Sequence, residues 1–303
     1  MKLIVEMELA RDAKLAYPKG VAVSGDNTLY FADGTNIRMV DRDGIITTVV
    51  GNHMHKSHWK PIPCEGTLNI EEVHLRWPTD LAINPLDDTL HVIDDHMVLQ
   101  LTSDSRVKVV AGRPLHCPAK GHSDIELATH ATLVMPQSIA FGPNGDLYVA
   151  ESDSQRINRV RVIGTDGKIM HYVGAESRCN CLDRGCDCFE EDHFLATSSK
   201  FNTISSIIVS PDGILHIADQ ANYRIRSVIA SLPEANAARE YEVYSPESQE
   251  LYIFNRFGQH IATKNILTGE MSYIFTYTVN TSNGKLSTVT DSAGKKFLAP
   301  GLL

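Results

Sequence analysis

The chain has 303 residues, 43% of them hydrophobic, which is enough to bury one large core or two moderate ones. Its formal net charge of -9 argues against wholesale binding to nucleic-acid phosphates, which requires clustered Lys and Arg. No apolar stretch approaches the roughly 18 residues that span a bilayer, and Glu6 and Glu8 interrupt the opening segment where a signal peptide stays apolar.

After residues 1–17, which we expect to be the end of a preceding segment or blade, one pattern recurs along the chain. Each copy has a short apolar run, a turn, a second apolar run that ends in an acidic residue, and a polar loop. Four copies begin at Pro18, Pro78, Pro136 and Ile204. Because such units bury their apolar faces only against neighbouring copies, the chain is expected to be an array.

Each copy predicts antiparallel strands. The first runs are short and rich in branched residues, which is typical of strands buried on both faces. They are Val21–Val23, Leu81–Ile83, Ile139–Phe141 and Ile207–Val209. The second runs are Leu29–Ala32, Leu90–Ile93, Leu147–Ala150 and Leu215–Ala218. Two further strands per copy give about four strands in 40 residues, the size of a β-propeller blade. The predicted fold is all-β, with an open or incomplete propeller of four recognisable blades over residues 18–231.

The acidic residue after the second run is expected to form a structural latch. Three copies carry an Arg five residues later, and an acid and an Arg at this spacing can form a charge-assisted pair across a tight loop. An Asn between them can hold the turn. The expected latch residues are Asp33, Asn36, Arg38, Glu151, Arg156, Asp219, Asn222 and Arg224. The second copy has Asp94 but lacks the Asn and the Arg, so its loop is expected to be built differently.

Long polar segments lie between the copies at residues 52–74, 113–130 and 175–200, and insertions at one point of a repeat emerge on one face. They contain all the cysteines, namely Cys64, Cys117, Cys179, Cys181, Cys186 and Cys188. The four in residues 179–188 could hold zinc, but structural zinc sites favour two to four residues between paired cysteines. We therefore expect three intrachain disulfides, with zinc or free thiols as the alternatives. Cys64 and Cys117 occupy matching insertions and could bridge, although sequence does not decide connectivity.

Catalytic and RNA-binding functions are weighed next. Some β-propellers are metal-dependent lyases and hydrolases. A catalytic metal site needs several His or carboxylate ligands that converge on the central channel. The stretches expected to line that channel here offer only Asp80 as a ligand. The histidines His53, His55 and His58 are interpreted as exposed loop residues. The acid-rich segment 181–192 argues against an RNA-binding face. No catalytic residue, metal, cofactor, nucleic acid or small-molecule substrate is therefore expected.

The sequence pattern changes after an expected linker at residues 232–239. Residues 240–303 contain shorter, aromatic-rich runs separated by turn signals, which predicts the beginning of a second, larger β domain. A single glycosylation sequon occurs at Asn280.

Two motifs resemble known repeats. Ser210–Ile225 resembles the NHL repeat almost position for position, and Gln249–Tyr252 with Gly284–Leu286 resembles the start of a YD-repeat shell. Together with Val110–Cys117 and the Cys-Asn-Cys and Cys-Asp-Cys pairs, the chain resembles the teneurins. This resemblance implies a non-catalytic extracellular module of a type II single-pass cell-surface receptor, attached to the membrane through parts absent from this chain. It implies cell–cell adhesion and neuronal partner matching, homophilic through the propeller and heterophilic with latrophilin-type receptors.

Overall fold

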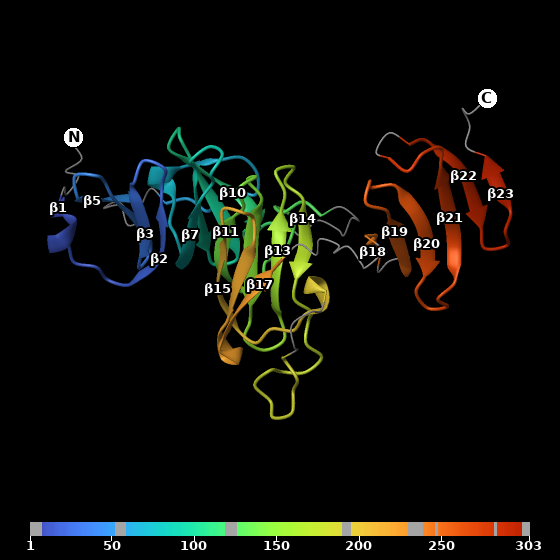
Figure 1. The fold of residues 1–303 in the computed structure, drawn as a ribbon. Helices are drawn as coiled ribbons and strands as arrows, with labels where there is room; N and C mark the ends of the chain where they lie inside the picture. Colours follow the sequence, from blue (N-terminus) through green and yellow to red (C-terminus); the bar gives the residue numbers. More distant parts are fainter. Residues whose placement is uncertain are drawn as a thin grey trace. The chain divides into compact units, whose positions relative to one another are not determined.

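The computed structural model describes residues 8–51, 59–118, 126–189, 195–229, 239–245, 248–281 and 284–298. The chain divides into two compact units, Met1–Ile229 and Ala230–Leu303. Both are built from β-strands, with only short 3-10 turns among the described residues (Figure 1). The expected linker at residues 232–239 lies outside the described residues except for Arg239.

The first unit contains four described sheets whose neighbouring strands are all antiparallel. The first has the order β1 (Glu8–Leu9), β5 (Ile45–Val50), β4 (Asn36–Val40), β3 (Leu29–Asp33), β2 (Pro18–Val23). The second has the order β6 (Leu68–Asn69), β10 (Arg106–Gly112), β9 (Met97–Thr102), β8 (Leu90–Asp94), β7 (Pro78–Ile83). The third runs β11 (Pro136–Phe141), β12 (Leu147–Ser152), β13 (Asn158–Ile163), β14 (Ile169–Val173), and the fourth runs β15 (Ile204–Val209), β16 (Leu215–Asp219), β17 (Arg224–Val228).

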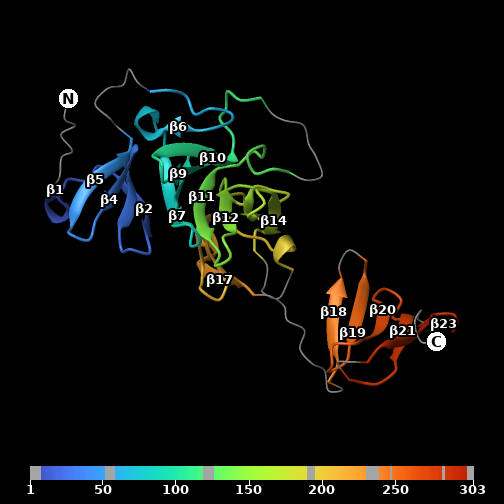
Figure 2. The same cartoon turned by 90° about the horizontal axis from the view of Figure 1, so that it is seen from above.

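These sheets are the four expected blades, and their first strands lie side by side in chain order. Strand β2 contacts β7, β7 contacts β11, and β11 contacts β15 (Figure 2). The hydrophobic cores lie between successive blades: Ile37 packs with Leu99, and Ile93 with Val149. Phe201 and Leu215 form the third core with residues of the preceding blade. The apolar faces are thus buried against neighbouring copies, as the repeat predicts, and also against the segments between the blades, which supply Leu75 and Leu133.

The first strand of every blade carries a bulge within its first four residues, where its register shifts against the second strand. Small or polar side chains occupy this position because the first strands approach closely there. Gly20 has φ +48°, and a Cβ on it would lie 2.8 Å from the Asp80 Cα. Asp80 Oδ2 accepts from Ser138 Oγ at 2.7 Å, and Ser138 Oγ accepts from Ile207 N at 3.1 Å. This chain of hydrogen bonds joins the second, third and fourth blades.

Turns and edge strands follow the same repeat. Gly145 and Gly213 have φ of 85° and 86°, a left-handed conformation that glycine adopts without strain in the turn between the first two strands. The segment before a blade returns to the outer strand of that blade, and Ala10 N donates to Gly44 O at 2.8 Å. Glu8 and Leu9, within the expected preceding segment, therefore extend the first sheet through β1.

The second unit is one antiparallel meander in the described residues. Its strands are β18 (Tyr241–Ser245), β19 (Glu250–Phe254), β20 (His260–Asn265), β21 (Met271–Tyr277), β22 (Leu286–Asp291) and β23 (Lys296–Leu298). The His260 ring packs beside Phe254 and Phe275, with centroid distances of 5.0 and 4.2 Å. Tyr277 Oη donates to the His260 carbonyl at 3.0 Å, which holds β21 against β20.

Candidate functional site

The acidic residue that ends the second strand has a role in each blade that the sequence pattern did not reveal. One carboxylate oxygen accepts backbone N–H groups from the segment that enters the blade. The donors are Ala16 and Tyr17 for Asp33, Arg76 and Trp77 for Asp94, Val134 for Glu151, and Asn202 for Asp219, at 2.6 to 2.8 Å. The latch therefore fixes the inter-blade loop to the blade. A recurring acid at the end of every second strand was the signal for it.

The partner of the second carboxylate oxygen differs from blade to blade. Asp33 Oδ2 lies 3.6 Å from Arg38 Nη1, the expected pair, and Asn36 lies opposite Asp33 in the strand ladder. Asp219 Oδ2 accepts from Asn222 Nδ2 at 2.9 Å. The expected partner Arg224 instead places its guanidinium over the Phe189 ring, 4.2 Å from the centroid.

The expected pair of Glu151 with Arg156 is wrong. Glu151 is fully buried and binds Arg159 at 3.0 Å and Arg161 at 2.7 Å. Arg156 donates to the Arg178 carbonyl at 3.1 Å. Loop length explains the difference. Arg156 lies in the loop between β12 and β13, before β13 begins, whereas Arg159 of β13 lies directly opposite Glu151 in the strand pairing.

The expectation of a different loop in the second blade is also wrong. Asp94 and Met97 close the same two-residue turn that Asp33 and Asn36 close in the first blade. Asp95, with φ 57°, takes the left-handed position that Gly34 takes there, which Asp tolerates. What differs is the carboxylate. Burial raises the pKa of Asp94 to about 6, against the lowering effect of its two backbone hydrogen bonds.

All six cysteines form disulfides, namely Cys64–Cys117, Cys179–Cys186 and Cys181–Cys188. No thiol of the chain therefore remains to serve as a thiolate ligand for zinc. The long bridge joins the segment before the second blade to the segment after it. The two short bridges interlock within ten residues, a connectivity that the sequence left open.

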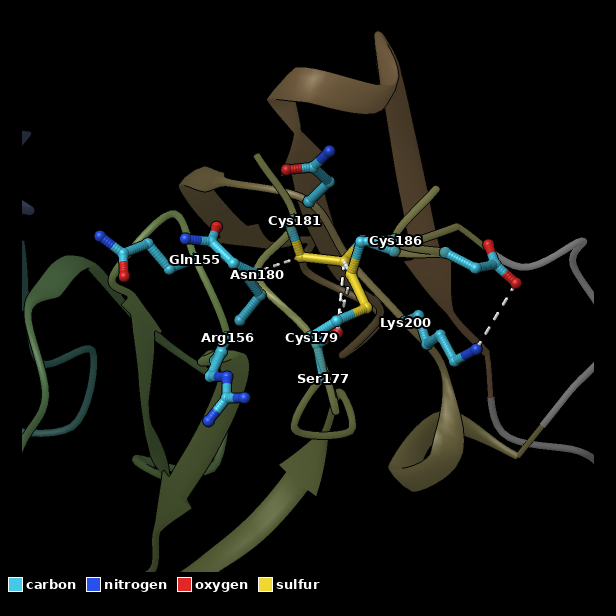
Figure 3. The surroundings of a disulfide bond; sticks show 12 residues. Gln155, Arg156, Ser177, Cys179, Asn180, Cys181, Cys186 and Lys200 are labelled. Carbon is cyan, nitrogen blue, oxygen red and sulfur yellow. Dashed lines mark hydrogen bonds and ion pairs between the residues drawn. A yellow bond between two sulfur atoms is a disulfide. The ribbon is translucent and has the colours of Figure 1, made fainter. Parts of the chain in front are cut away.

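The doubly bridged loop is fastened to the blades on both sides (Figure 3). Ser177 Oγ lies 3.3 Å from Cys188 Sγ, and Cys181 N donates to the Gln155 carbonyl at 2.9 Å. Asn222 of the fourth blade donates to the Cys188 carbonyl at 3.1 Å. The tip of the loop exposes Leu182 by 71%. Disulfides and hydrogen bonds thus hold this exposed tip in a fixed conformation.

Two cavities flank the Cys64–Cys117 bridge at the second blade. The first has a volume of about 490 Å³, and the second, of about 460 Å³, is lined by the bridge itself. In the first, the rings of Trp59 and His74 stack with centroids 3.9 Å apart. Its wall holds many charged and titratable groups, namely Lys60, His74, Arg76, Asp94, Asp95, His96, Arg113 and His116. Sequence reasoning missed this cluster because its members come from four separate segments.

The remaining predicted residues are dispersed. Asp80, the one expected channel ligand, is engaged by Ser138 Oγ and by the backbone N–H of Ile139 at 3.0 Å, and burial raises its pKa. His53, His55 and His58 lie outside the described residues. Asn280 is exposed, whereas Ser282 of its sequon is outside the described residues. No described helix is both long and apolar enough to cross a membrane.

Known proteins resemble this chain over almost its whole length. The Teneurin NHL domain family matches residues 6–230, and the Teneurin YD-shell family matches residues 238–299. Teneurin-m of Drosophila melanogaster is 74% identical over 289 residues, which cover 95% of this chain and 11% of that protein. Human Teneurin-4 is 43% identical, over 94% of this chain and 10% of that protein. The chain thus spans about a tenth of the length of these relatives.

Solved structures show more distant likeness. A Bacteroides thetaiotaomicron protein of unknown function has a TM-score of 0.48 at 17% identity, covering 69% of this chain and 46% of that chain. A streptogramin B lyase has a TM-score of 0.40 at 13% identity, covering 97% of this chain and 73% of that chain. Both scores are too low to bear on function. By its two family matches and its near relatives, this chain belongs to the teneurin family.

Proposed function

We propose that this chain is a non-catalytic extracellular recognition module of a teneurin-like cell-surface receptor. The proposed role of the module is cell–cell adhesion and partner matching between neurons. Family membership supports a role at the cell surface. The three disulfides support an oxidising compartment, because such bonds persist outside the cell and are rare in the cytosol.

The observation that carries the proposal is the doubly bridged loop. Recognition is commonly placed on loops that a rigid scaffold holds in position. Residues 177–188 have that form, because two disulfides and contacts to the third and fourth blades fix the backbone while Leu182 stays exposed. We place the adhesive contact at this loop and expect a second copy of the propeller as one partner and a latrophilin-type receptor as the other.

A cell-aggregation assay tests the proposal. Cells that display the chain on their surface should aggregate with one another, and they should also bind cells that display a latrophilin-type receptor. Leu182→Asp should reduce aggregation at least severalfold, because it places a charge on the exposed tip. Leu267→Asp is the matched control, since Leu267 is exposed to a similar degree, 74% against 71%, in the second unit. Absence of aggregation and of receptor binding would refute the adhesive role, and an equal loss in both variants would refute the placement at the loop.

A further inference from the structure

The second blade differs from the other three in how its latch carboxylate is satisfied. In the first and third blades the chain supplies arginine guanidinium groups, and in the fourth it supplies the amide of Asn222. In the second blade, Met97 and Leu99 occupy the positions of Asn36 and Arg38. Asp94 Oδ1 still accepts the two backbone N–H groups at 2.7 and 2.8 Å. Among the described residues, no hydrogen bond or ion pair reaches Oδ2.

This carboxylate lines the cavity of about 490 Å³ although Asp94 is only 1% exposed. A carboxylate oxygen that borders a cavity and accepts no hydrogen bond from the described residues marks a place where a ligand donor would be stabilised. The volume falls in the range of small-ligand pockets and exceeds what one water molecule needs.

The cations on the cavity wall already have partners. Arg76 Nη1 lies 3.5 Å from Asp95 Oδ2, and Lys60 pairs with Glu72. Arg113 Nη1 donates to the Cys117 carbonyl at 2.6 Å. His96 Nε2 lies 3.3 Å from Asp95 Oδ1. None of these contacts is a side-chain hydrogen bond or ion pair to Asp94, although the nearby charge of Arg76 partly offsets the rise in the pKa of Asp94.

We propose that this cavity is a binding site for a guanidinium group, such as an exposed arginine side chain of a partner protein, with Asp94 as the acceptor. The other blades support this choice of ligand, because an arginine side chain of the chain pairs with the latch carboxylate in the first and third blades. A guanidinium can donate charge-assisted hydrogen bonds to Oδ2, because Oδ1 already accepts two backbone N–H groups. The stacked rings of Trp59 and His74 give the cavity a flat aromatic wall.

The titration behaviour of the site follows from its neighbours. Asp94, with its pKa near 6, is ionised at pH 7 and protonated at pH 5. The other charged or titratable groups on the cavity wall are Lys60, His74, Arg76, Asp95, His96, Arg113 and His116. Loss of the negative charge of Asp94 disfavours a cationic ligand, so binding should weaken by about tenfold between pH 7 and pH 5.

Isothermal titration calorimetry with N-acetyl-arginine amide tests the site on the whole chain. The neutral isostere N-acetyl-citrulline amide keeps the size and shape of the ligand and removes its charge. Saturable binding of the arginine compound, at least tenfold tighter than the citrulline compound, is the expected result. Equal affinity for the two compounds, or no saturable binding of the arginine compound at millimolar concentration, would overturn the proposal.

Two variants localise the binding. Asp94→Asn keeps an oxygen for the N–H groups of Arg76 and Trp77 and removes the charge, and it should weaken binding at least tenfold. Asp104→Asn removes a carboxylate of the same blade outside the cavity and should leave affinity unchanged. If Asp94→Asn does not fold, the affinity of the unmodified chain for the arginine compound is measured at pH 7 and at pH 5 instead. An affinity that stays constant between these pH values would contradict a role for Asp94. The assay involves no cells, so its outcome is separate from that of the adhesion experiment.

Discussion

At the scale of single residues, the buried ion pairs of the third blade dominate the energetics of the latch. Glu151 is fully buried and is shared between Arg159 and Arg161, whose side chains are 29% and 9% exposed. Removing one partner of a buried pair is costly, because it leaves the others desolvated without compensation. Glu151→Gln should therefore lower the free energy of unfolding by about 3 kcal/mol in urea titrations.

Arg156→Ala is the matched control for that experiment. Arg156 was the partner that sequence spacing favoured, yet in the described part of the chain its side chain donates only to the exposed Arg178 carbonyl. Its removal should change the free energy of unfolding by no more than about 0.5 kcal/mol, as is usual for surface positions. A larger effect of Arg156→Ala than of Glu151→Gln would contradict the observed pairing.

His91 gives the propeller a dependence on pH. Burial between the blades lowers the pKa of His91 to about 4, and its ring packs edge-on against Phe141 with centroids 4.8 Å apart. A lowered folded-state pKa means that stability is complete above the unfolded value near 6.5 and is lost as pH falls toward 4. Relative to His91→Gln, the unmodified chain should lose about 2 kcal/mol between pH 7 and pH 4.5.

The comparison with His91→Gln isolates this effect from that of Asp94. The raised pKa of Asp94 has the opposite sign: its contribution is full below about 3.8 and is lost as pH rises through about 6. Because Asp94 is present in both proteins, its effect cancels in the difference. Parallel stability curves for the two proteins from pH 7 to pH 4.5 would show that His91 does not titrate in the folded state.

At the scale of elements, repetition made the strands predictable and the loops only partly so. Apolar runs at fixed intervals located the first two strands of every blade. The expectation that the first runs are buried on both faces is wrong for the first and fourth blades, where Val21, Val23 and Ile208 are 62%, 57% and 64% exposed. Partners across loops depended on loop length instead. The five-residue offset pairs Asp33 with Arg38 across a two-residue turn, but in the third blade it places Arg156 within the loop.

The candidate site was less predictable than the blades. Its cysteines were evident, but their connectivity depends on how two loops meet at Cys64–Cys117 and on how the chain folds within residues 179–188. The cavity at Asp94 combines residues from the segments around 59–62, 74–76 and 113–116 with the β8–β9 turn. The only sign of this cavity in the sequence was that Asp94 is not followed by the Asn and Arg of the other copies. That absence was read as a change in loop geometry, whereas the second blade has the same two-residue turn as the first and differs from it in the carboxylate oxygen that no Arg reaches.

The disulfides should differ in their contributions according to the loops they close. Cys64–Cys117 spans 53 residues, whereas Cys179–Cys186 spans 7. In the chain-entropy description, a longer closed loop restricts the unfolded state more. Replacing both cysteines of the long bridge with Ser should cost about 4 kcal/mol, and replacing Cys179 and Cys186 about 2 kcal/mol. Chemical denaturation of the two double variants measures this, and the reverse order would show that local packing outweighs loop entropy.

At the scale of the whole molecule, the division into two compact units separates the effects of redox conditions. All three disulfides lie within Met1–Ile229, and the meander of residues 230–303 contains no cysteine. Each unit has its own buried residues, so each should unfold as a separate cooperative transition. A reductant acts only on the first unit and removes constraints from its unfolded state.

Differential scanning calorimetry with and without a reductant therefore distinguishes the two units. Reduction should lower the Tm of the propeller transition by at least 10 °C, since it removes several kcal/mol of stabilisation from a domain of about 200 residues. The transition of the meander should stay where it is. A deletion variant that lacks residues 239–303 assigns the peaks, because only the reductant-sensitive transition should remain in it. A single transition that shifts as a whole on reduction would show instead that the meander depends on the propeller for its stability.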